Sequence, residues 1–208
     1  MFNLRMARPQ LTDDVVDATR KRLVTLALAL YRSEGLEAIT FRRLADTAGI
    51  SHTLPYRYFR NKEAVLVAMR VACTQHFDDF VRARETAGAP PMQQIREVAA
   101  AYVGFVSEHP DDYLLIFSLE QPPPSRYPEL LAARRHLFDH ATDVVQRAID
   151  TGDLEGEARA LTHLFWVSLH GLMTLHVAGQ LVHGHDMTTL LDPLMQLMLK
   201  STAAEAPP

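Results

Sequence analysis

Apolar residues recur along most of the chain at the three- and four-residue spacing that places them on one face of an α-helix. The clearest stripe is formed by Leu23, Leu26, Ala27, Leu30 and Tyr31. Few stretches alternate polar and apolar residues with the β-branched enrichment that is typical of strands. The pattern therefore predicts an all-α protein with about nine helices.

Glycine, proline and capping residues divide the stripes into separate helices, the first of which has Thr12 as its expected N-cap. The expected helices cover residues 12–34, 41–48, 52–59, 62–84, 92–109, 111–119, 128–149, 157–182 and 189–200. The segment AGAPP at 87–91 is the clearest boundary in the sequence. The loop QPPPSR at 121–126 cannot be α-helical, because each proline removes a backbone donor. The tail, residues 201–208, is expected to be disordered.

Composition excludes several classes of protein. With 48% hydrophobic and 22% charged residues among 208, the chain has the balance of a globular protein rather than a disordered one. The single cysteine, Cys73, excludes a disulfide scaffold and fits a reducing, cytoplasmic compartment. The N-terminus has no apolar secretion signal. Three histidines interrupt the apolar stretch 161–182, so we expect a buried helix there rather than a membrane span.

Charge is distributed unevenly along the chain. The first 70 residues carry 12 Lys and Arg against 7 Asp and Glu, whereas the remaining 138 carry 9 against 18. An acidic body with a basic N-terminal part suggests that only the N-terminal part meets a polyanion. Chance clustering of charge is the alternative on this observation alone.

Residues 40–63, TFRRLADTAGISHTLPYRYFRNKE, carry the most specific pattern. Thr40 is expected to cap a short helix, and Gly49 would supply a left-handed turn at its end. Ser51 would then cap a second helix over 52–59. This succession has helix-turn-helix spacing, which presents the second helix to the major groove of DNA. An ordinary helical bundle with a solvated basic face would show a similar pattern.

The start of the next expected helix also points to a polyanion. Asn61 is expected to cap this helix, with Lys62 at its first position. A lysine there is unfavourable against the positive end of the helix dipole. The arrangement is favourable if Lys62 and the free N–H groups of the first turn meet one phosphate.

The stretch from residue 23 to 66 resembles the DNA-binding domain of TetR-family transcriptional regulators. The matching strings are Ser33-Glu34-Gly35, Leu44-Ala45, Ala48-Gly49-Ile50-Ser51, Tyr56-Arg57-Tyr58-Phe59 and Asn61-Lys62-Glu63-Ala64-Val65-Leu66. The resemblance implies a three-helix helix-turn-helix domain over residues 1–66. A ligand-binding and dimerisation domain over residues 67–200 would follow it.

The resemblance also implies which residues contact DNA. They lie at the start of the second helix, on the recognition helix and at the start of the next helix: Thr40, Arg42, Arg43, His52, Thr53, Leu54, Tyr56, Arg57, Tyr58 and Lys62. Pro55 departs from the family, which usually has Leu or Ile at this position. If the helix begins at Ser51, Pro55 removes its first intrahelical hydrogen bond. If the helix begins nearer Thr53, the proline costs little.

The C-terminal part resembles a TetR-family subgroup named for a Trp-His-Gly signature, here Trp166, His170 and Gly171. We expect a ligand pocket between the helix ending at His109, the short helix through Phe117 and the long helix with Trp166. Its candidate lining residues are Tyr102, Phe105, Val106, His109, Tyr113, Phe117, Trp166, His170 and Met173. This mainly apolar lining suits a neutral or weakly polar ligand. Each of these residues could instead simply pack the core.

No catalytic or metal centre is expected. Histidine pairs such as His136 and His140 have chelating spacing, but the sequence shows no third or fourth converging ligand. We read this pair as part of a solvated helix face. The chain contains no dinucleotide fingerprint, phosphate loop, nucleophile elbow or zinc-protease motif. We therefore expect no metal, no cofactor and no enzyme.

The sequence thus predicts a ligand-responsive transcriptional regulator and favours a repressor that a small, mainly apolar ligand releases from its operator. The expected partners are a near-palindromic double-stranded DNA, a small-molecule effector and a second copy of the chain, with no membrane. The two copies would pair through helices 157–182 and 189–200, where Gly171 and Gly179 would allow close approach. The alternatives are an architectural DNA-binding protein without an effector and a transcriptional activator.

Overall fold

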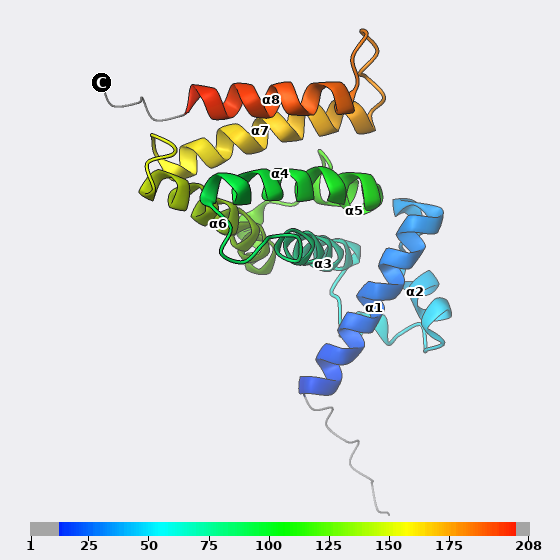
Figure 1. Ribbon diagram of the computed structural model, residues 1–208. Coiled ribbons are helices and arrows are strands. Elements are labelled where there is room, and N and C mark those ends of the chain that lie inside the picture. Colours follow the sequence, from blue (N-terminus) through cyan, green and yellow to red (C-terminus); the bar gives the residue numbers. More distant parts are fainter. Residues whose placement is uncertain (1–12, 203–208) are drawn as a thin grey trace, which may run out of the picture. The chain divides into compact units, whose positions relative to one another are not determined.

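A computed structural model describes residues 13–202, and within this range the chain forms α-helices and short 3-10 turns without strands (Figure 1). The α-helices of this range are α1 (Asp13–Glu34), α2 (Phe41–Ala48), α3 (Lys62–Arg82), α4 (Pro91–Glu108), α5 (Pro110–Phe117), α6 (Pro128–Asp150), α7 (Ala158–Val177) and α8 (Met187–Ser201). The 3-10 turns are Leu36–Ala38, Pro55–Arg57 and Pro124–Arg126. The predicted all-α class is confirmed. The expected N-cap Thr12 lies outside the described residues.

The chain divides into two compact units, and the boundary falls inside α3, between Ala72 and Cys73. The segment at 87–91 is therefore not a domain boundary but a connection between α3 and α4 within the second unit. Its prolines end one helix and begin the next, which produces the same sequence signal as an interdomain linker.

In the first unit, α2 is delimited by the caps that its sequence predicts. The Thr40 hydroxyl accepts a hydrogen bond from the Arg43 N–H at 3.1 Å. Gly49 has a φ of 66°, and the Ile50 N–H turns back to the Ala45 carbonyl at 3.0 Å. This left-handed ending satisfies the last carbonyls of α2 and sets the direction of the chain that follows.

Helix α3 contributes buried apolar residues to both units. Before the boundary the buried apolar residues are Val65, Val67, Ala68 and Met69, and after it they are Cys73, Phe77, Phe80 and Val81. A helix that is apolar around most of its circumference is expected where it packs on several neighbours.

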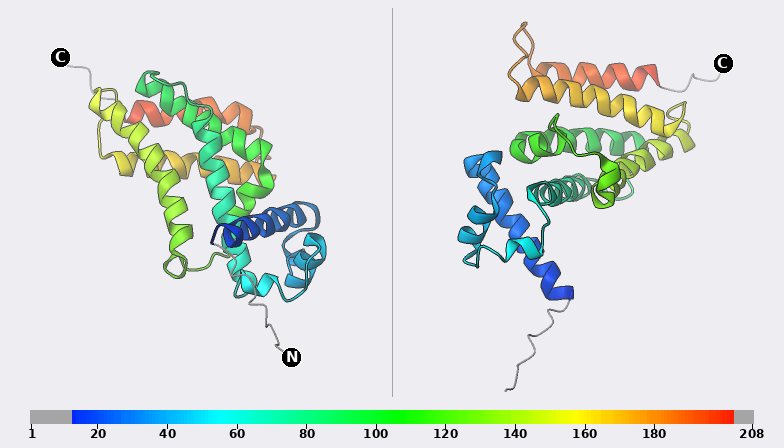
Figure 2. Two further views of the ribbon diagram at one scale, coloured as in Figure 1. Left: turned by 90° about the horizontal axis from the view of Figure 1, so that it is seen from below. Right: turned by 180° about the vertical axis from the view of Figure 1, so that it is seen from behind.

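The core of the second unit lies among α3, α4, α6 and α7. Phe77 of α3 stacks on Phe105 of α4, with ring centroids 4.2 Å apart and an interplanar angle of 13°. Helix α6 packs against α4 and α7, and α8 runs alongside α7 (Figures 1 and 2). Within residues 13–202, no helix has both the length and the apolar character needed to cross a membrane.

The ends of α7 and α8 are among those that differ from the prediction. Helix α7 ends at Val177 rather than at residue 182, because Gly179 adopts a φ of 65° and the Gln180 N–H closes onto the Leu175 carbonyl at 2.8 Å. Helix α8 includes Ser201, which we expected in the disordered tail. Residues 203–208 of that tail lie outside the described range.

Candidate DNA interface and apolar cavity

The expected recognition helix over 52–59 is replaced by a much shorter element. Only Pro55–Arg57 is helical, and it is a 3-10 turn rather than an α-helix. Its N-cap is Leu54 instead of Ser51, so Pro55 occupies the first position, where a missing N–H costs least. The prediction of an α-helix here is wrong, and the later of the two expected starts is the one observed.

Pro55 gives the physical reason for the short turn. Because it cannot donate a backbone hydrogen bond, the segment closes with bonds between residues three apart. The N–H groups of Leu54, Arg57 and Tyr58 each donate to the carbonyl three residues earlier at 2.9–3.0 Å. Pro55 itself is buried. The segment thus keeps a helical direction while it tightens.

The segment still presents polar and aromatic groups to solvent. Tyr56 is 63% exposed, and its ring meets the edge of Phe41 of α2 at a centroid distance of 4.3 Å. Thr53 and Arg57 are exposed, whereas Leu54 and Tyr58 are half-buried. Of the predicted contact residues, Tyr56 and Arg57 belong to the 3-10 turn itself, and both are exposed.

Three of the remaining candidate DNA contacts have acidic partners. The Arg43 guanidinium donates to Glu34 at 2.6 Å, His52 Nε2 lies 2.7 Å from Asp46 Oδ1, and the Lys62 ammonium lies 3.8 Å from Glu37. These pairs are exposed, and exposed pairs contribute little stability. A phosphate can therefore replace the carboxylates at low cost.

The start of α3 has the geometry of a phosphate site. Asn61 Oδ1 accepts the Ala64 N–H at 2.9 Å, which confirms Asn61 as the cap. The exposed Lys62 stands at the first helical position, and Arg42 of α2 and its N-cap Thr40 are also exposed. Free N–H groups and a lysine at a helix start are suited to an anion.

A cavity of about 510 Å³ lies in the second unit. Most of its wall is apolar: Phe77 and Val81 of α3, Ile95, Val98, Ala99 and Tyr102 of α4, Leu137, Phe138, Ala141, Val144 and Val145 of α6, Phe165, Trp166 and Leu169 of α7, and Met195, Met198 and Leu199 of α8. This volume and composition are those of small-molecule sites.

Only some of the predicted pocket residues line this cavity. Tyr102, Phe117 and Trp166 line it. The wall does not include Phe105, Val106, His109, Tyr113, His170 and Met173. Four of these are core residues, with Phe105, Val106, Tyr113 and Met173 at most 2% exposed. The apolar spacing of these residues on α4, α5 and α7 indicates a buried helix face. It does not distinguish a residue that packs in the core from one that lines a pocket.

Helix α6 is the part of the site that sequence reasoning missed. Its apolar stripe, which includes Leu137, Ala141 and Val144, faces the cavity. The stripe is visible in the sequence, but a stripe alone does not say whether a neighbouring helix or a void lies opposite. Met198 and Leu199 of α8, which belong to the helix expected to form the dimer contact, line this wall.

Arg134, Arg135 and Arg159 line the cavity; Arg159 pairs with Asp139, and Arg134 has a neutral partner. Arg134 of α6 donates to the amide oxygen of Gln121 at 2.7 Å, and Gln121 in turn donates to the Ile116 and Ser118 carbonyls at 3.0 and 2.9 Å. Burial lowers the pKa of the Arg134 guanidinium, which nevertheless remains charged. Among the described residues, no carboxylate lies within salt-bridge distance of Arg134. This guanidinium can therefore accept an anionic group.

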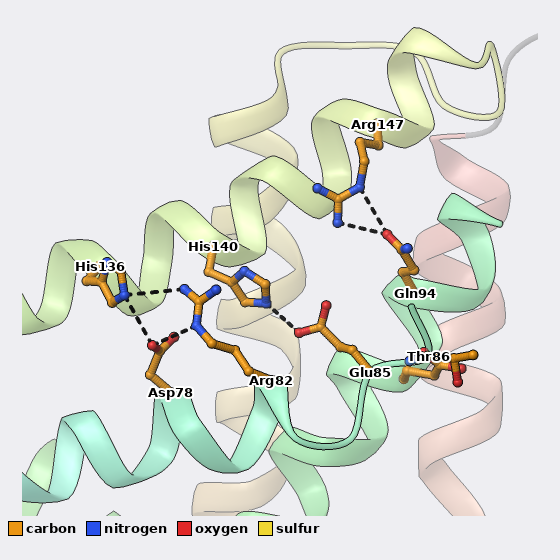
Figure 3. A network of polar contacts seen from close by, with 9 residues as sticks. Asp78, Arg82, Glu85, Thr86, Gln94, His136, His140 and Arg147 are labelled. Carbon is orange, nitrogen blue, oxygen red and sulfur yellow. Dashed lines mark hydrogen bonds and ion pairs between the residues drawn. The ribbon is translucent and has the colours of Figure 1, made fainter. Parts of the chain in front are cut away.

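His136 is 71% exposed, in line with the expected solvated face, whereas His140 is only 13% exposed and departs from it. Both histidines connect α6 to α3 and the turn after it (Figure 3). His136 Nε2 lies 3.4 Å from Asp78, which also accepts from Arg82 at 2.8 Å, and His140 is hydrogen-bonded to Glu85. A buried carboxylate such as Asp78 needs such partners.

His170 forms the centre of a second polar cluster. Its Nδ1 lies 3.1 Å from the Tyr102 hydroxyl and 2.9 Å from the Tyr113 hydroxyl, which also bonds Thr174 at 3.1 Å. Burial raises the pKa of both phenols and lowers the pKa of the His170 imidazole. The neutral forms of all three rings are therefore favoured.

We predict that His170 makes the stability of the protein decrease in acid. Its pKa is lowered in the folded state, whereas the unfolded chain takes up a proton below its ordinary pKa of about 6.5. The free energy of unfolding should therefore fall as the pH drops through about 6.5. Urea titrations at several pH values should show a weaker pH dependence for His170→Gln. The exposed His176→Gln on the same helix should behave like the wild type, and equal pH dependence in all three proteins would contradict the assignment.

Comparison with known proteins follows the same division of the chain. Residues 23–69 match the sequence model of bacterial regulatory proteins of the tetR family, and residues 95–198 match that of the tetracyclin repressor-like C-terminal domain. The HTH-type transcriptional regulator BetI of Rhizobium meliloti is 34% identical over 103 residues, which cover 43% of this chain and 51% of BetI. The chain spans about half the length of the curated relatives it matches.

Solved structures share the fold over nearly the whole chain. A protein of unknown function from Rhodococcus sp. RHA1 superposes with a TM-score of 0.77 at 22% identity, covering 96% of this chain and 99% of that one. The regulator FadR from Bacillus subtilis, in complex with stearoyl-CoA, superposes with a TM-score of 0.68 at 14% identity, covering 86% and 97%. Together with the helix-turn-helix region and the helical second unit, the two matched models show that the chain belongs to the tetR family of bacterial regulatory proteins.

Proposed function

We propose that this protein is a sequence-specific DNA-binding transcriptional regulator, and that it is a repressor released from its operator by a small, mainly apolar ligand. The observation that carries the proposal is an apolar cavity of about 510 Å³ in a chain whose other unit is a helix-turn-helix domain. The setting is the bacterial cytoplasm. The relatives BetI and KstR are transcriptional regulators, and we propose no enzymatic activity.

Two kinds of contact would bind DNA. Tyr56 and Arg57 project from the Pro55–Arg57 turn and would reach base edges in the major groove. Lys62 and the N–H groups at the start of α3 would hold a backbone phosphate, which fixes position without reading sequence. Because the turn is only three residues long, we expect few base contacts from each copy of the chain.

The effector would be an apolar molecule that carries an anionic group. Apolar walls from α3, α4, α6, α7 and α8 would bury its body, and Arg134 would bind its charge. This changes our expectation of a neutral ligand, because Arg134 lies on α6, the helix that sequence reasoning left out. The stearoyl-CoA complex of the structurally similar FadR has a ligand of the same general chemistry.

A second copy of the chain would cover an apolar face on α7 and α8. Leu164, Val167 and Leu175 of α7 are 59%, 61% and 47% exposed, and Leu197 of α8 is 68% exposed. A Cβ placed on Gly171, on the same face of α7, would meet nothing within 4 Å. Pairing of this face with its copy would form a four-helix interface with a two-fold axis. We also propose that Trp166, His170 and Gly171 mark the Trp-His-Gly subgroup.

Release from DNA would follow from a difference in ligand affinity between two states of the dimer. A ligand shifts the equilibrium only by as much as it prefers the state that does not fit the operator. The main alternative, an architectural DNA-binding protein without an effector, would keep its DNA affinity whatever fills the cavity. A transcriptional activator would bind the same DNA and differ only in the direction of the response.

We predict that the DNA contacts separate into base-reading and phosphate-binding groups. Arg57→Ala and Tyr56→Phe should each lower affinity for a selected operator by about 1–3 kcal/mol and relax its sequence preference. Lys62→Ala should weaken binding to all sequences and reduce the salt slope by about one per half-site. The exposed Lys200→Ala in α8 serves as the control for loss of a cation. Unchanged operator affinity in the first three variants would contradict the interface.

The apolar face predicts a dimer in solution. Analytical ultracentrifugation at micromolar concentration should give twice the mass of the chain. Val167→Glu should convert the dimer to a monomer, because the interface would bury an unpaired charge in each copy. The same change at Leu119, which is fully exposed and lies outside α7 and α8, should leave the dimer intact. A monomeric wild type would contradict the proposed interface.

The cavity predicts a charge-dependent response to amphiphilic probes. Trp166, the single tryptophan, lines the wall, so its fluorescence should change on titration with dodecanoate and with dodecan-1-ol. Arg134→Met should lower the affinity for dodecanoate by about ten- to a hundredfold and leave the affinity for dodecan-1-ol unchanged, because only the carboxylate loses a charged partner. Arg96→Met, exposed and outside the cavity, should bind both probes like the wild type.

Filling the cavity provides the second half of this test. Ala141→Phe should prevent both probes from binding while the protein stays folded, because the new ring occupies the void. Phe105→Ala is unsuitable for this purpose, since that residue is fully buried and its loss would cost about 3–5 kcal/mol of stability. If Ala141→Phe binds both probes like the wild type, the ligand site lies elsewhere.

A further inference from the structure

Three metal-ligating side chains converge in the second unit, away from the cavity wall. They are His76 of α3, His109 between α4 and α5, and Asp112 in the first turn of α5. One ligand atom from each lies within 4.8 Å of the other two. The sequence alone does not reveal this cluster, because His76 lies 33 positions before His109 and on a different helix from Asp112.

The local structure fixes the backbone of the cluster. The His109 N–H donates to the Phe105 carbonyl at 2.8 Å, and the His109 carbonyl accepts the Tyr113 N–H at 3.1 Å. His109 therefore ends α4 and begins α5 at the same time. A donor held at such a junction has few backbone conformations open to it, which reduces the entropy that ion binding would cost.

The side chains combine one buried anion with two accessible imidazoles. Asp112 is 2% exposed, and its Oδ2 lies 3.1 Å from His76 Nδ1. The His76 side chain is 42% exposed, and His109 is half-buried. The two imidazole rings are 4.5 Å apart between centroids. An ion can thus enter from solvent past the imidazoles and meet the carboxylate on the inner side.

Aromatic rings enclose the inner side of the cluster. Phe105 lies 5.4 Å from the His76 ring and 5.3 Å from the His109 ring, and Phe80 lies 5.5 Å from His109. An apolar surrounding limits the access of water and strengthens the attraction between a cation and the Asp112 carboxylate.

The distances suit a first-row transition metal after a small adjustment. Bonds of about 2.0–2.1 Å in a tetrahedral site place ligand atoms about 3.4 Å apart. The His76–Asp112 separation is close to this value, and the partly exposed imidazoles can rotate to shorten the longer separations. Two imidazole nitrogens and one carboxylate oxygen favour zinc, cobalt or nickel over magnesium or calcium, which prefer oxygen ligands.

We propose that His76, His109 and Asp112 form a binding site for a divalent transition metal ion that fastens α3 to the junction of α4 and α5. Three protein ligands leave at least one coordination position for water or another donor. Such a site exchanges its ion more readily than a closed four-ligand site. The proposal stands independently of DNA and effector binding, because it rests on contacts within the second unit alone.

The test is a cobalt titration of the full-length protein after dialysis against a chelator. Visible absorption of Co²⁺ should report one site per chain, and Zn²⁺ should displace the cobalt. His76→Gln and His109→Gln should each lower the Co²⁺ affinity by about tenfold or more. Both histidine side chains are partly exposed, so these two variants are expected to fold. Asp112 is buried, so Asp112→Asn is used as a third variant only if circular dichroism shows that it is folded.

A matched control separates this site from a competing one. His183 and His185 precede Asp186 in an exposed connection, and this short motif could bind the same ions weakly. The double variant His183→Gln/His185→Gln should keep the one-site titration of the wild type. The proposal is overturned if His76→Gln and His109→Gln bind Co²⁺ like the wild type, if the double variant abolishes the site, or if the wild type gives no cobalt spectrum, in which case the cluster is a hydrogen-bonded histidine–aspartate pair only.

Discussion

The burial of apolar side chains along α3 is the constraint on which the other features depend. This one helix supplies Met69 to the core of the first unit and Phe77 to the core of the second, so it has to continue across the boundary between them. Its first turn provides the proposed phosphate site at Lys62, and its last turns contribute Val81 to the cavity wall and Asp78 to the contacts with α6. Each proposed activity therefore uses at least one residue that α3 holds in place.

Local sequence signals predicted the parts of the structure that local interactions determine. The caps at Thr40, Gly49 and Asn61 are set by hydrogen bonds within a few residues, and the structure contains all three. The prediction of an α-helix over 52–59 failed for an equally local reason. Pro55 removes one backbone donor, and a 3-10 turn forms in place of the expected α-helix. The fold class and the caps around the helix-turn-helix region could thus be predicted, but the 3-10 turn within that region could not.

The cavity depends on packing between distant segments, and most of its lining could not be predicted. An apolar stripe shows that a helix face is buried, yet Phe105 meets another ring while Leu137 meets a void. The same limit applies to the polar groups. Arg134 and His76 are unremarkable in the sequence, and their chemistry emerges only when Gln121 and Asp112 approach them from other parts of the chain. In both cases tertiary contacts decide what a residue can bind.

We propose that the cavity and the DNA interface of this chain are thermodynamically coupled. The direct measurement is a linkage experiment with an operator fragment selected from random DNA and dodecanoate as the probe ligand. Saturating dodecanoate should weaken operator binding by a factor of about 5–150, and saturating operator should weaken dodecanoate binding by the same factor, because coupling free energies are reciprocal. An operator affinity that stays the same while Trp166 fluorescence reports a filled cavity would contradict the account.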